Sequence, residues 1–173
     1  MASVWRRVDL GAEFEGLFDS VRHGVWRWEC QGDYYADHAD VLRWQTGEPP
    51  VEDERVRAWM RYIQGLRTAG IPFQRVRMLS EPLTEYLEWM LDTTGRSIAA
   101  GEDIRWVGQD LAHELDMPDY DFYIFDDRVA ILHFDDRRRL TSADLIDEND
   151  VVQSHRDLRD LIWQYAIPHQ EFT

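Results

Sequence analysis

The residues best placed for chemistry lie in an acidic stretch between residues 119 and 136. It contains six aspartates and one histidine, and the candidates among them are Asp121, Asp126, Asp127, His133, Asp135 and Asp136. Carboxylate oxygens are the ligands that hard cations prefer, and histidine can act as a general base. We therefore take Asp126, Asp127, His133 and Asp135 as candidate metal ligands. Such a site would support a metal-assisted hydrolase or a nuclease-like enzyme.

The same stretch also fits an ordinary hairpin with a solvated turn. Aspartate tolerates turn geometry and the left-handed conformation, so Asp126-Asp127-Arg128 has turn composition. The acids at 135–136 precede three arginines with which they can pair. No calcium-loop spacing is present, and no nucleophile for a catalytic triad lies nearby. We expect the solvated turn rather than the metal site, and His133 as a structural histidine.

A second set of polar residues alternates with apolar ones along predicted strands. Its members are Arg27, Glu29, Arg75, Arg77, Glu81, Glu102, Arg105 and the neighbouring Trp106. Guanidinium groups hold carboxylates or phosphates through paired hydrogen bonds, and aromatic rings offer stacking surface. If these strands are neighbours, their polar side chains converge on one sheet face. That face would bind a protein partner or a small anionic or nucleotide-like ligand.

The candidate binding residues on this face are Arg75, Arg77, Glu81, Tyr86, Arg105 and Trp106. The alternative is an internal network of arginine and glutamate that stabilises a half-exposed sheet. The two interpretations differ in one feature, because a binding face would leave a concave pocket with unpaired guanidinium groups. No catalytic residue is assigned from this set.

Composition limits the classes of protein that this chain can belong to. Its 173 residues predict one domain spanning 1–173, and 44% hydrophobic residues supply ample core material. The single Cys30 excludes an intramolecular disulfide and a cysteine-rich zinc site. All 19 basic residues are arginine, so Schiff-base lysines, Walker-type phosphate loops and a His-Lys-Asp phospholipase centre are excluded. We expect no cofactor.

The charge of the chain bears on its partners. A net charge of −15 opposes direct contact with nucleic acid, which requires basic patches. It does not exclude contact with a basic protein partner, such as a DNA-binding regulator. The chain start lacks a signal-peptide pattern, and the apolar runs are shorter than a bilayer span, so we expect a cytoplasmic protein without membrane contact. One or two of the eight tryptophans can mark a protein interface.

Periodicity predicts the elements that position these residues. Helical spacing covers 12–21, 33–45, 52–69, 83–91, 109–115 and 148–166. Strands are predicted at 25–30, 73–79, 102–107, 122–125, 129–134 and 140–145. Ser80 is the expected start signal of the fourth helix, and Gly70 the expected end signal of the third. Together these elements predict an α/β (or α+β) fold. We expect a mixed sheet of about five or six strands with flanking helices, which includes one parallel βαβ unit and one acidic antiparallel hairpin.

Several segments together resemble an actinobacterial family of unknown function. They are residues 14–20, 47–50, 75–86, 100–106, 122–127 and 133–135. The resemblance covers about 12 to 172, and members of that family are often encoded beside helix-turn-helix regulators. The second half, from about Arg75, is also similar to the effector-like domain of such regulators, which is akin to a catalytically dead phospholipase D-like fold. The resemblance implies a regulatory partnership and transfers no catalytic residues.

The leading hypothesis is a non-enzymatic, cytoplasmic regulatory or interaction protein that works with a helix-turn-helix regulator and can sense a small anionic ligand. The first alternative is the metal-assisted hydrolase or nuclease-like enzyme built on the acidic hairpin. The second is a toxin-like or phage-defence component. No oligomeric state follows from the sequence.

Overall fold

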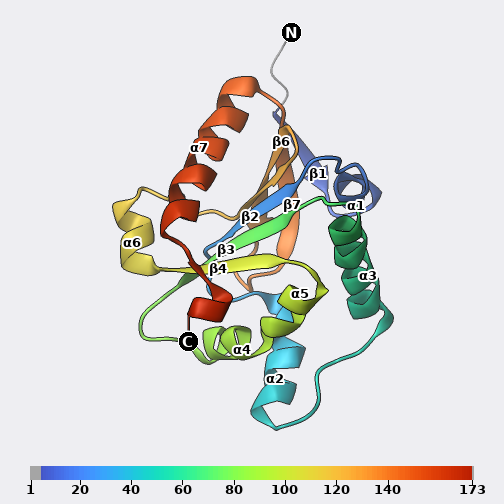
Figure 1. Ribbon diagram of the computed structural model, residues 1–173, viewed down its shortest axis with the longest axis vertical. Coiled ribbons are helices and arrows are strands. Elements are labelled where there is room, and N and C mark those ends of the chain that lie inside the picture. Colours follow the sequence, from blue (N-terminus) through green and yellow to red (C-terminus); the bar gives the residue numbers. More distant parts are fainter. Residues whose placement is uncertain (1–4, 173) are drawn as a thin grey trace.

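Eight strands form one mixed sheet with helices on both of its faces (Figure 1). The computed structural model describes residues 5–172. The strands are β1 (Trp5–Asp9), β2 (Val25–Glu29), β3 (Phe73–Leu79), β4 (Asp103–Gly108), β5 (Phe122–Phe125), β6 (Arg128–Phe134), β7 (Leu140–Ile146) and β8 (Ile167–Pro168). They lie in the order β1-β7-β6-β5-β2-β3-β4-β8.

Seven α-helices and two short 3-10 helices connect these strands within the described residues. They are α1 (Ala12–Asp19), η1 (Tyr35–Asp37), α2 (His38–Gln45), α3 (Glu54–Thr68), α4 (Glu85–Thr93), α5 (Gly95–Ala100), α6 (Gln109–Glu114), α7 (Asn149–Tyr165) and η2 (His169–Glu171). No helix between residues 5 and 172 is both long enough and apolar enough to cross a bilayer.

The predicted fold class is confirmed, but the sheet is larger than expected. β3 and β4 pair in parallel across α4 and α5, and β5 and β6 form the acidic antiparallel hairpin. The sheet has eight strands rather than five or six. The two additional strands lie at its edges, where β1 pairs with β7 and the two-residue β8 pairs with β4.

A second parallel pair joins β2 to β3. The connection between these strands contains η1, α2 and α3, so it is a second, longer crossover beside the predicted one. Its register sets Arg27 opposite Arg75 and Glu29 opposite Arg77. The polar positions of both strands therefore fall on the same face of the sheet, since side chains alternate between faces with a period of two.

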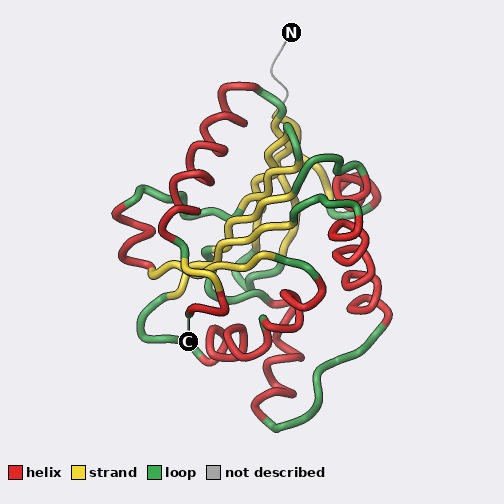
Figure 2. The backbone as a smooth tube through the Cα atoms, viewed as in Figure 1, coloured by secondary structure: helices red, strands yellow, loops and turns green. Residues whose placement is uncertain are grey.

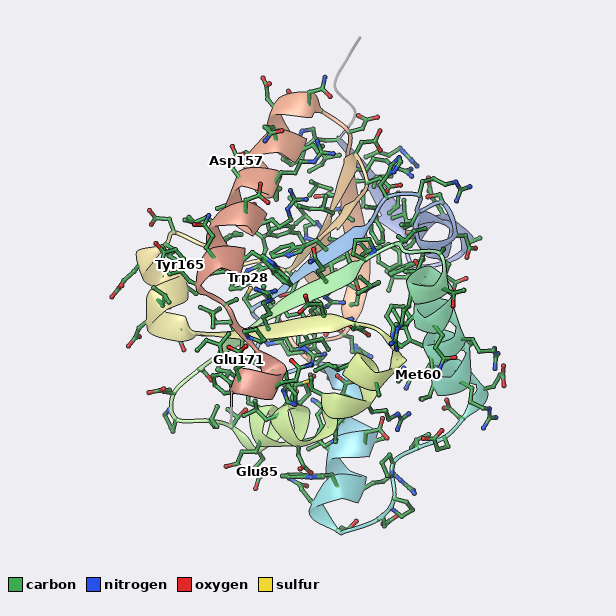
Figure 3. All side chains as sticks on the ribbon, viewed as in Figure 1. Trp28, Met60, Glu85, Asp157, Tyr165 and Glu171 are labelled. Carbon is green, nitrogen blue, oxygen red and sulfur yellow. The ribbon has the colours of Figure 1, made fainter. Side chains whose placement is uncertain are left out.

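The helices cover the two faces in separate groups (Figure 2). On one face, α6 and α7 pack their apolar side chains, including Ala112, Val152 and Ile162, against Trp26 and Trp28 of β2. On the other face, α1 and α3 cover the part near β5–β7, and α2 and α4 pack near β3 and β4. Figure 3 shows this division, with Trp28 on the α7 side of the sheet and Met60 on α3 at the opposite side.

Two helix boundaries show how local residues set the elements. Gly70 follows α3 with φ 71°, and the N–H of Ile71 bonds to the carbonyl oxygen of Leu66, so the predicted end signal is confirmed. The predicted start of the next helix at Ser80 is wrong. Thr84 caps α4 by accepting the N–H of Leu87 at 3.2 Å, while the Glu81–Pro82 peptide is cis and lies outside the helix.

Candidate ligand-binding site on the arginine strands

Three arginines and three acids form one connected group on the face of the sheet opposite α7. We call it the arginine network, and its charged members are Arg27, Glu29, Arg75, Arg77, Glu102 and Asp121. The side chains of all six are at most 13% exposed. Because a buried charge needs a partner, the geometry of these pairs decides whether the network is stable.

Glu29 is the centre of the network. Its Oε1 accepts a hydrogen bond from Arg75 Nη1 at 2.6 Å, and its Oε2 accepts one from Arg77 Nε at 2.5 Å. Arg27 Nε lies 3.1 Å from Oε1. Burial alone would raise the pKa of Glu29, but the guanidinium groups of Arg77, Arg75 and Arg27 outweigh it and hold this pKa well below its usual range. The carboxylate is therefore ionised and immobilised by three cations.

Glu102 closes the network on the β4 side. Arg75 donates to its Oε2 through Nε at 3.1 Å, with Nη2 at 3.0 Å from the same oxygen. The indole N–H of Trp59 on α3 donates to the other oxygen at 3.2 Å. All three nitrogens of the Arg75 guanidinium are thus occupied by Glu29 and Glu102, so this arginine is held in one orientation.

Asp121 closes the network on the β5 side and is fully buried. Its Oδ2 accepts from Tyr34 Oη at 2.6 Å and from Arg27 Nη2 at 3.3 Å, and its Oδ1 accepts from the backbone N–H of Cys30 at 2.9 Å. Burial raises the pKa of Asp121 despite the nearby Arg27. Burial, followed by the charge of Asp121, also raises the pKa of the Cys30 thiol, so this cysteine is a poor nucleophile.

A large pocket opens above the arginine network. Its volume is about 1420 Å³, and it lies between β2–β3 and the helices α1 to α5. Aromatic residues contribute much of its wall: Phe18, Tyr34, Tyr35, Trp44, Trp59, Tyr62, Trp89, Tyr123 and Phe134. The floor carries Arg27, Glu29, Arg75 and Arg77. Ligand sites commonly combine apolar walls with a few oriented polar groups in this way.

Not every donor on the floor is used. Arg77 donates a hydrogen bond through Nε to Glu29 and another through Nη1 to Thr94 Oγ1 at 2.7 Å. Its Nη2 has no hydrogen-bond partner among residues 5–172. Arg27 Nε is buried and, despite its closeness to Glu29, makes no hydrogen bond of good geometry. The site thus shares features of both sequence interpretations, because it has a concave pocket and its arginines are mostly paired.

The structure brings only part of the predicted binding set to this pocket. Arg75 and Arg77 line it. Trp106 lies beneath Arg77, with its ring centre 5.6 Å from the guanidinium carbon, and is fully buried. Tyr86 is buried nearby and donates to Asp37 at 2.6 Å.

The other two predicted binding residues lie elsewhere. Glu81 is exposed on the loop after β3 and does not line the pocket. Arg105 lies on the opposite face of the sheet, where its guanidinium carbon is 3.7 Å from the ring centre of Trp163 on α7. Residues 105 and 106 are neighbours in β4, so alternation sends their side chains to opposite faces.

The predicted metal ligands of the acidic hairpin do not converge. Asp126 has φ 52° in the turn, and its carboxylate accepts the backbone N–H groups of residues 22–24 at 2.8 to 2.9 Å. Partial burial would raise its pKa, but these N–H donors lower it. Asp127 is exposed.

The remaining two hairpin residues also have protein partners. His133 Nε2 lies 2.8 Å from Asp144, which also pairs with Arg7 on β1. Asp135 accepts from Arg139 Nε at 2.7 Å. In the described part of the chain, no three side chains of His, Cys, Asp or Glu type are close enough together to hold a metal ion.

Several residues of the pocket do not stand out as binding residues in the sequence. Arg27 and Glu29 stood out as alternating polar positions, but their central place depends on the β2–β3 register. Tyr34, Thr94 and Tyr123 carry no sequence signal of their own. Their contacts to Asp121, Arg77 and Arg27 join parts of the chain that only the fold brings together.

The chain matches a family model by sequence and is similar in fold to solved structures. Residues 12–173 match the family model described as a domain of unknown function (DUF6879). No curated protein sequence matches the chain. Among solved structures, the protein is similar to NucT from Helicobacter pylori, with a TM-score of 0.54 and 11% identity over 96% of this chain and 99% of that one.

A second similar structure is TrmBL2, described as an archaeal chromatin protein with a novel mode of DNA binding. The TM-score is 0.52 with 12% identity, over 95% of this chain and 54% of TrmBL2. The chain therefore spans about half the length of TrmBL2. At these identities both likenesses concern the fold alone.

Proposed function

The chain belongs to the family described as a domain of unknown function (DUF6879), and we propose that it is a non-enzymatic regulatory protein that binds a small anionic ligand above its arginine network. In this proposal the ligand-bound protein acts on a helix-turn-helix regulator, which makes the contact with DNA.

The observation that carries the proposal is the pocket of about 1420 Å³ over a floor of fixed arginines. Arg75 and Arg77 are held by Glu29, so a ligand that accepts hydrogen bonds from this floor does not have to immobilise them. Binding groups that are already ordered cost less conformational entropy, which favours affinity for a small molecule. The free Nη2 of Arg77 supplies one donor for such a ligand.

The charge of the chain supports a division of labour with a DNA-binding partner. At −15 it repels the phosphate backbone, so binding of DNA by this domain itself is unfavourable. TrmBL2, whose description concerns DNA binding, is about twice the matched length, so the fold accompanies further chain in that protein. We propose that here a separate regulator takes the DNA-binding role.

Native mass spectrometry and thermal unfolding test the ligand. The purified protein is exposed to the small-molecule fraction of a bacterial extract. We expect a bound small anion and a raised melting temperature, both lost in Arg77→Gln. Arg105→Gln is the matched control, because that arginine lies on the opposite face, and it should retain the ligand. Absence of any bound molecule in the wild type would overturn the proposal.

Co-purification tests the partner. The tagged full chain is isolated at low salt from bacterial cells that express it, and the bound proteins are identified by mass spectrometry. A helix-turn-helix protein should be recovered, in an amount that changes when the ligand fraction is added. If no such protein is enriched over an untagged control, the regulatory part of the proposal is wrong.

The enzymatic alternatives remain predictions from the sequence. Asp126, His133 and Asp135 all have protein partners in the structure, and no geometric observation favours a reaction at the hairpin.

A further inference from the structure

We infer that the ligand of this pocket is a nucleotide, with its base stacked between the aromatic walls above the arginine network and its phosphate on arginines of α3 and α5. This inference rests on the proposed function and specifies its ligand. Three parts of the pocket carry it, namely the walls, the floor and the side formed by α3 and α5.

The aromatic walls present rings whose orientation is fixed. Trp59 is held through its indole N–H by Glu102 at 3.2 Å and lies against Tyr62, with ring centres 5.5 Å apart. Trp44 is held in the same way, since its indole N–H donates to Asp92 at 2.7 Å. Both tryptophans line the pocket from different helices, α3 and α2. Rings anchored on different helices around one pocket suit a flat heteroaromatic group, because nucleobases stack on aromatic side chains regardless of sequence.

The floor suits the edge of a base better than a phosphate. Three arginines face three acids there, so its formal charge is balanced when all six are ionised. A phosphate on the floor would come close to Glu29 and Glu102. A base edge carries hydrogen-bond donors and acceptors side by side. It can therefore accept from Arg77 Nη2 while it donates to a neighbouring carboxylate oxygen.

The α3 and α5 side of the pocket offers cations for a phosphate. Arg55 lines the pocket and has no ion-pair partner among residues 5–172. Arg96 of α5 pairs with Glu52 at 3.2 Å, and that carboxylate side chain is 64% exposed. This ion pair links α5 to the segment just before α3, three positions from Arg55 in the sequence. Ser97, next to Arg96, also lines the pocket and makes no side-chain hydrogen bond in the described residues.

These donors match what a phosphate needs. Guanidinium groups bind phosphate oxygens in a bidentate manner, and an exposed glutamate that holds Arg96 can be displaced by a doubly charged anion. The pocket volume of about 1420 Å³ exceeds the 300–1000 Å³ of common ligand sites, which leaves room for a base, a ribose and a phosphate together.

Isothermal titration calorimetry on the full chain tests the inference. The probes are AMP, GMP, CMP and UMP, the matching nucleosides, inorganic phosphate, benzoate and a ten-nucleotide DNA strand. We expect at least one monophosphate to bind roughly tenfold or more tightly than its nucleoside and than inorganic phosphate, since each bidentate arginine adds a factor of that order. The DNA strand should bind no more tightly than the monophosphate.

Three variants separate the parts of the pocket. The double variant Arg55→Gln, Arg96→Gln should reduce the affinity for the monophosphate to that of its nucleoside and leave the nucleoside unchanged. Trp44→Leu should weaken nucleoside and monophosphate equally. Arg105→Gln should change neither, because it lies behind the sheet. Melting temperatures measured without ligand confirm that each variant is folded.

The outcomes distinguish the nucleotide from the pocket itself. If mass spectrometry finds an Arg77-dependent ligand that is not a nucleotide, or if benzoate binds more tightly than every monophosphate, the nucleotide is wrong and the ligand-binding function stands. If the DNA strand binds most tightly, a nucleic-acid chain replaces the small molecule and the inference fails. If no probe and no extract component binds, both proposals fail.

Discussion

Strands β2 and β3 present two faces of opposite character, one apolar and the other charged. Facing α6 and α7, the strands present Trp26, Trp28 and Val76, which are at most 3% exposed within a continuous apolar core. Facing α1 to α5, the alternate positions present Arg27, Glu29, Arg75 and Arg77 beneath an open pocket. One face is covered by packed helices, and the other borders the pocket with charged side chains that pair with each other.

The difference shows how a sheet can place charged side chains beneath a pocket and still be stable, because its other face is apolar. The apolar face supplies burial, which is the main source of folding free energy. The charged face adds little net stability, because desolvation of the ions offsets most of their attraction. What the arginine network provides is a fixed arrangement of donors, and this arrangement tolerates the loss of a member poorly.

The largest effect should come from Glu29→Gln. This change removes the charge that three arginines share and leaves buried cations without their main partner. We expect the free energy of unfolding to fall by about 3–5 kcal/mol, as for other broken buried pairs. Urea denaturation followed by tryptophan fluorescence measures it.

Glu13→Gln is the matched control for this prediction. Glu13 pairs with Arg6 on the surface, where both side chains are about half exposed. The loss there should stay below about 1 kcal/mol. If both variants lose the same free energy of unfolding, the buried network contributes no more to stability than the surface pair does.

The opposite face should respond to Trp28→Phe. The change removes the N–H that donates to the carbonyl oxygen of Pro118 at 3.0 Å and leaves a small cavity in a fully buried position. We expect a loss of about 2 kcal/mol. Binding of the pocket ligand should be unaffected, and calorimetry on this variant checks that. A loss of binding would mean that the two faces are not independent.

The pH dependence of stability should reflect the low pKa of Glu29. Below the ordinary glutamate pKa of about 4.3, the unfolded chain takes up a proton at this position while the folded protein does not. The stabilising contribution is therefore complete above that pH and is lost as the pH falls through the folded-state pKa. The slope per such group is up to about 1.4 kcal/mol per pH unit.

NMR titration of side-chain carboxyl carbons assigns this effect to its residue. At about pH 3.5 the signal of Glu29 should still be that of an ionised group, when exposed glutamates are largely protonated. Asp121 should behave in the opposite way and protonate at a higher pH than exposed aspartates, because burial raises its pKa. A Glu29 signal that titrates with the exposed glutamates would contradict the proposed balance of charges.

The smallest effect is expected at the acidic hairpin. Asp126→Asn keeps a residue that tolerates the positive φ but removes the charge that three backbone N–H groups share. We expect a loss of about 1 kcal/mol in thermal or urea unfolding. Asp127→Asn, at the exposed neighbour, should change stability by less than about 0.5 kcal/mol. A larger loss at 127 than at 126 would reverse these assignments.

The sequence predicted the central elements of the fold because their periodicity is strong. The helix at 148–166 and the hairpin strands were found within a few residues of their observed bounds. β1 was not, because Val8 is its only buried side chain and the strand shows no alternation. β8 is two residues long and contains a proline, so it has no strand pattern at all. Such edge strands exist only because a neighbour pairs with them.

The site was less predictable than the fold for a geometric reason. Arg75 and Arg77 could be placed on one face by alternation alone. Which face of β4 joins them depends on the register between β3 and β4, and this register places Trp106 rather than Arg105 on the pocket side. The central role of Glu29 depends on a parallel pairing across two helices. Sequence spacing carries no information on either.

The pairing of β1 with β7 limits how early this edge of the sheet can fold during synthesis. Arg7 and Asp144, which bond across these strands, are 137 residues apart in the chain. At 5–20 residues per second, a ribosome needs roughly 7–27 s to reach the partner of the first strand. During that interval the N-terminal strand has no place in a sheet. The β1 edge of the sheet can form only after β7 has been synthesised, so the early strand of a nascent chain depends on this later segment, or on chaperones, for protection.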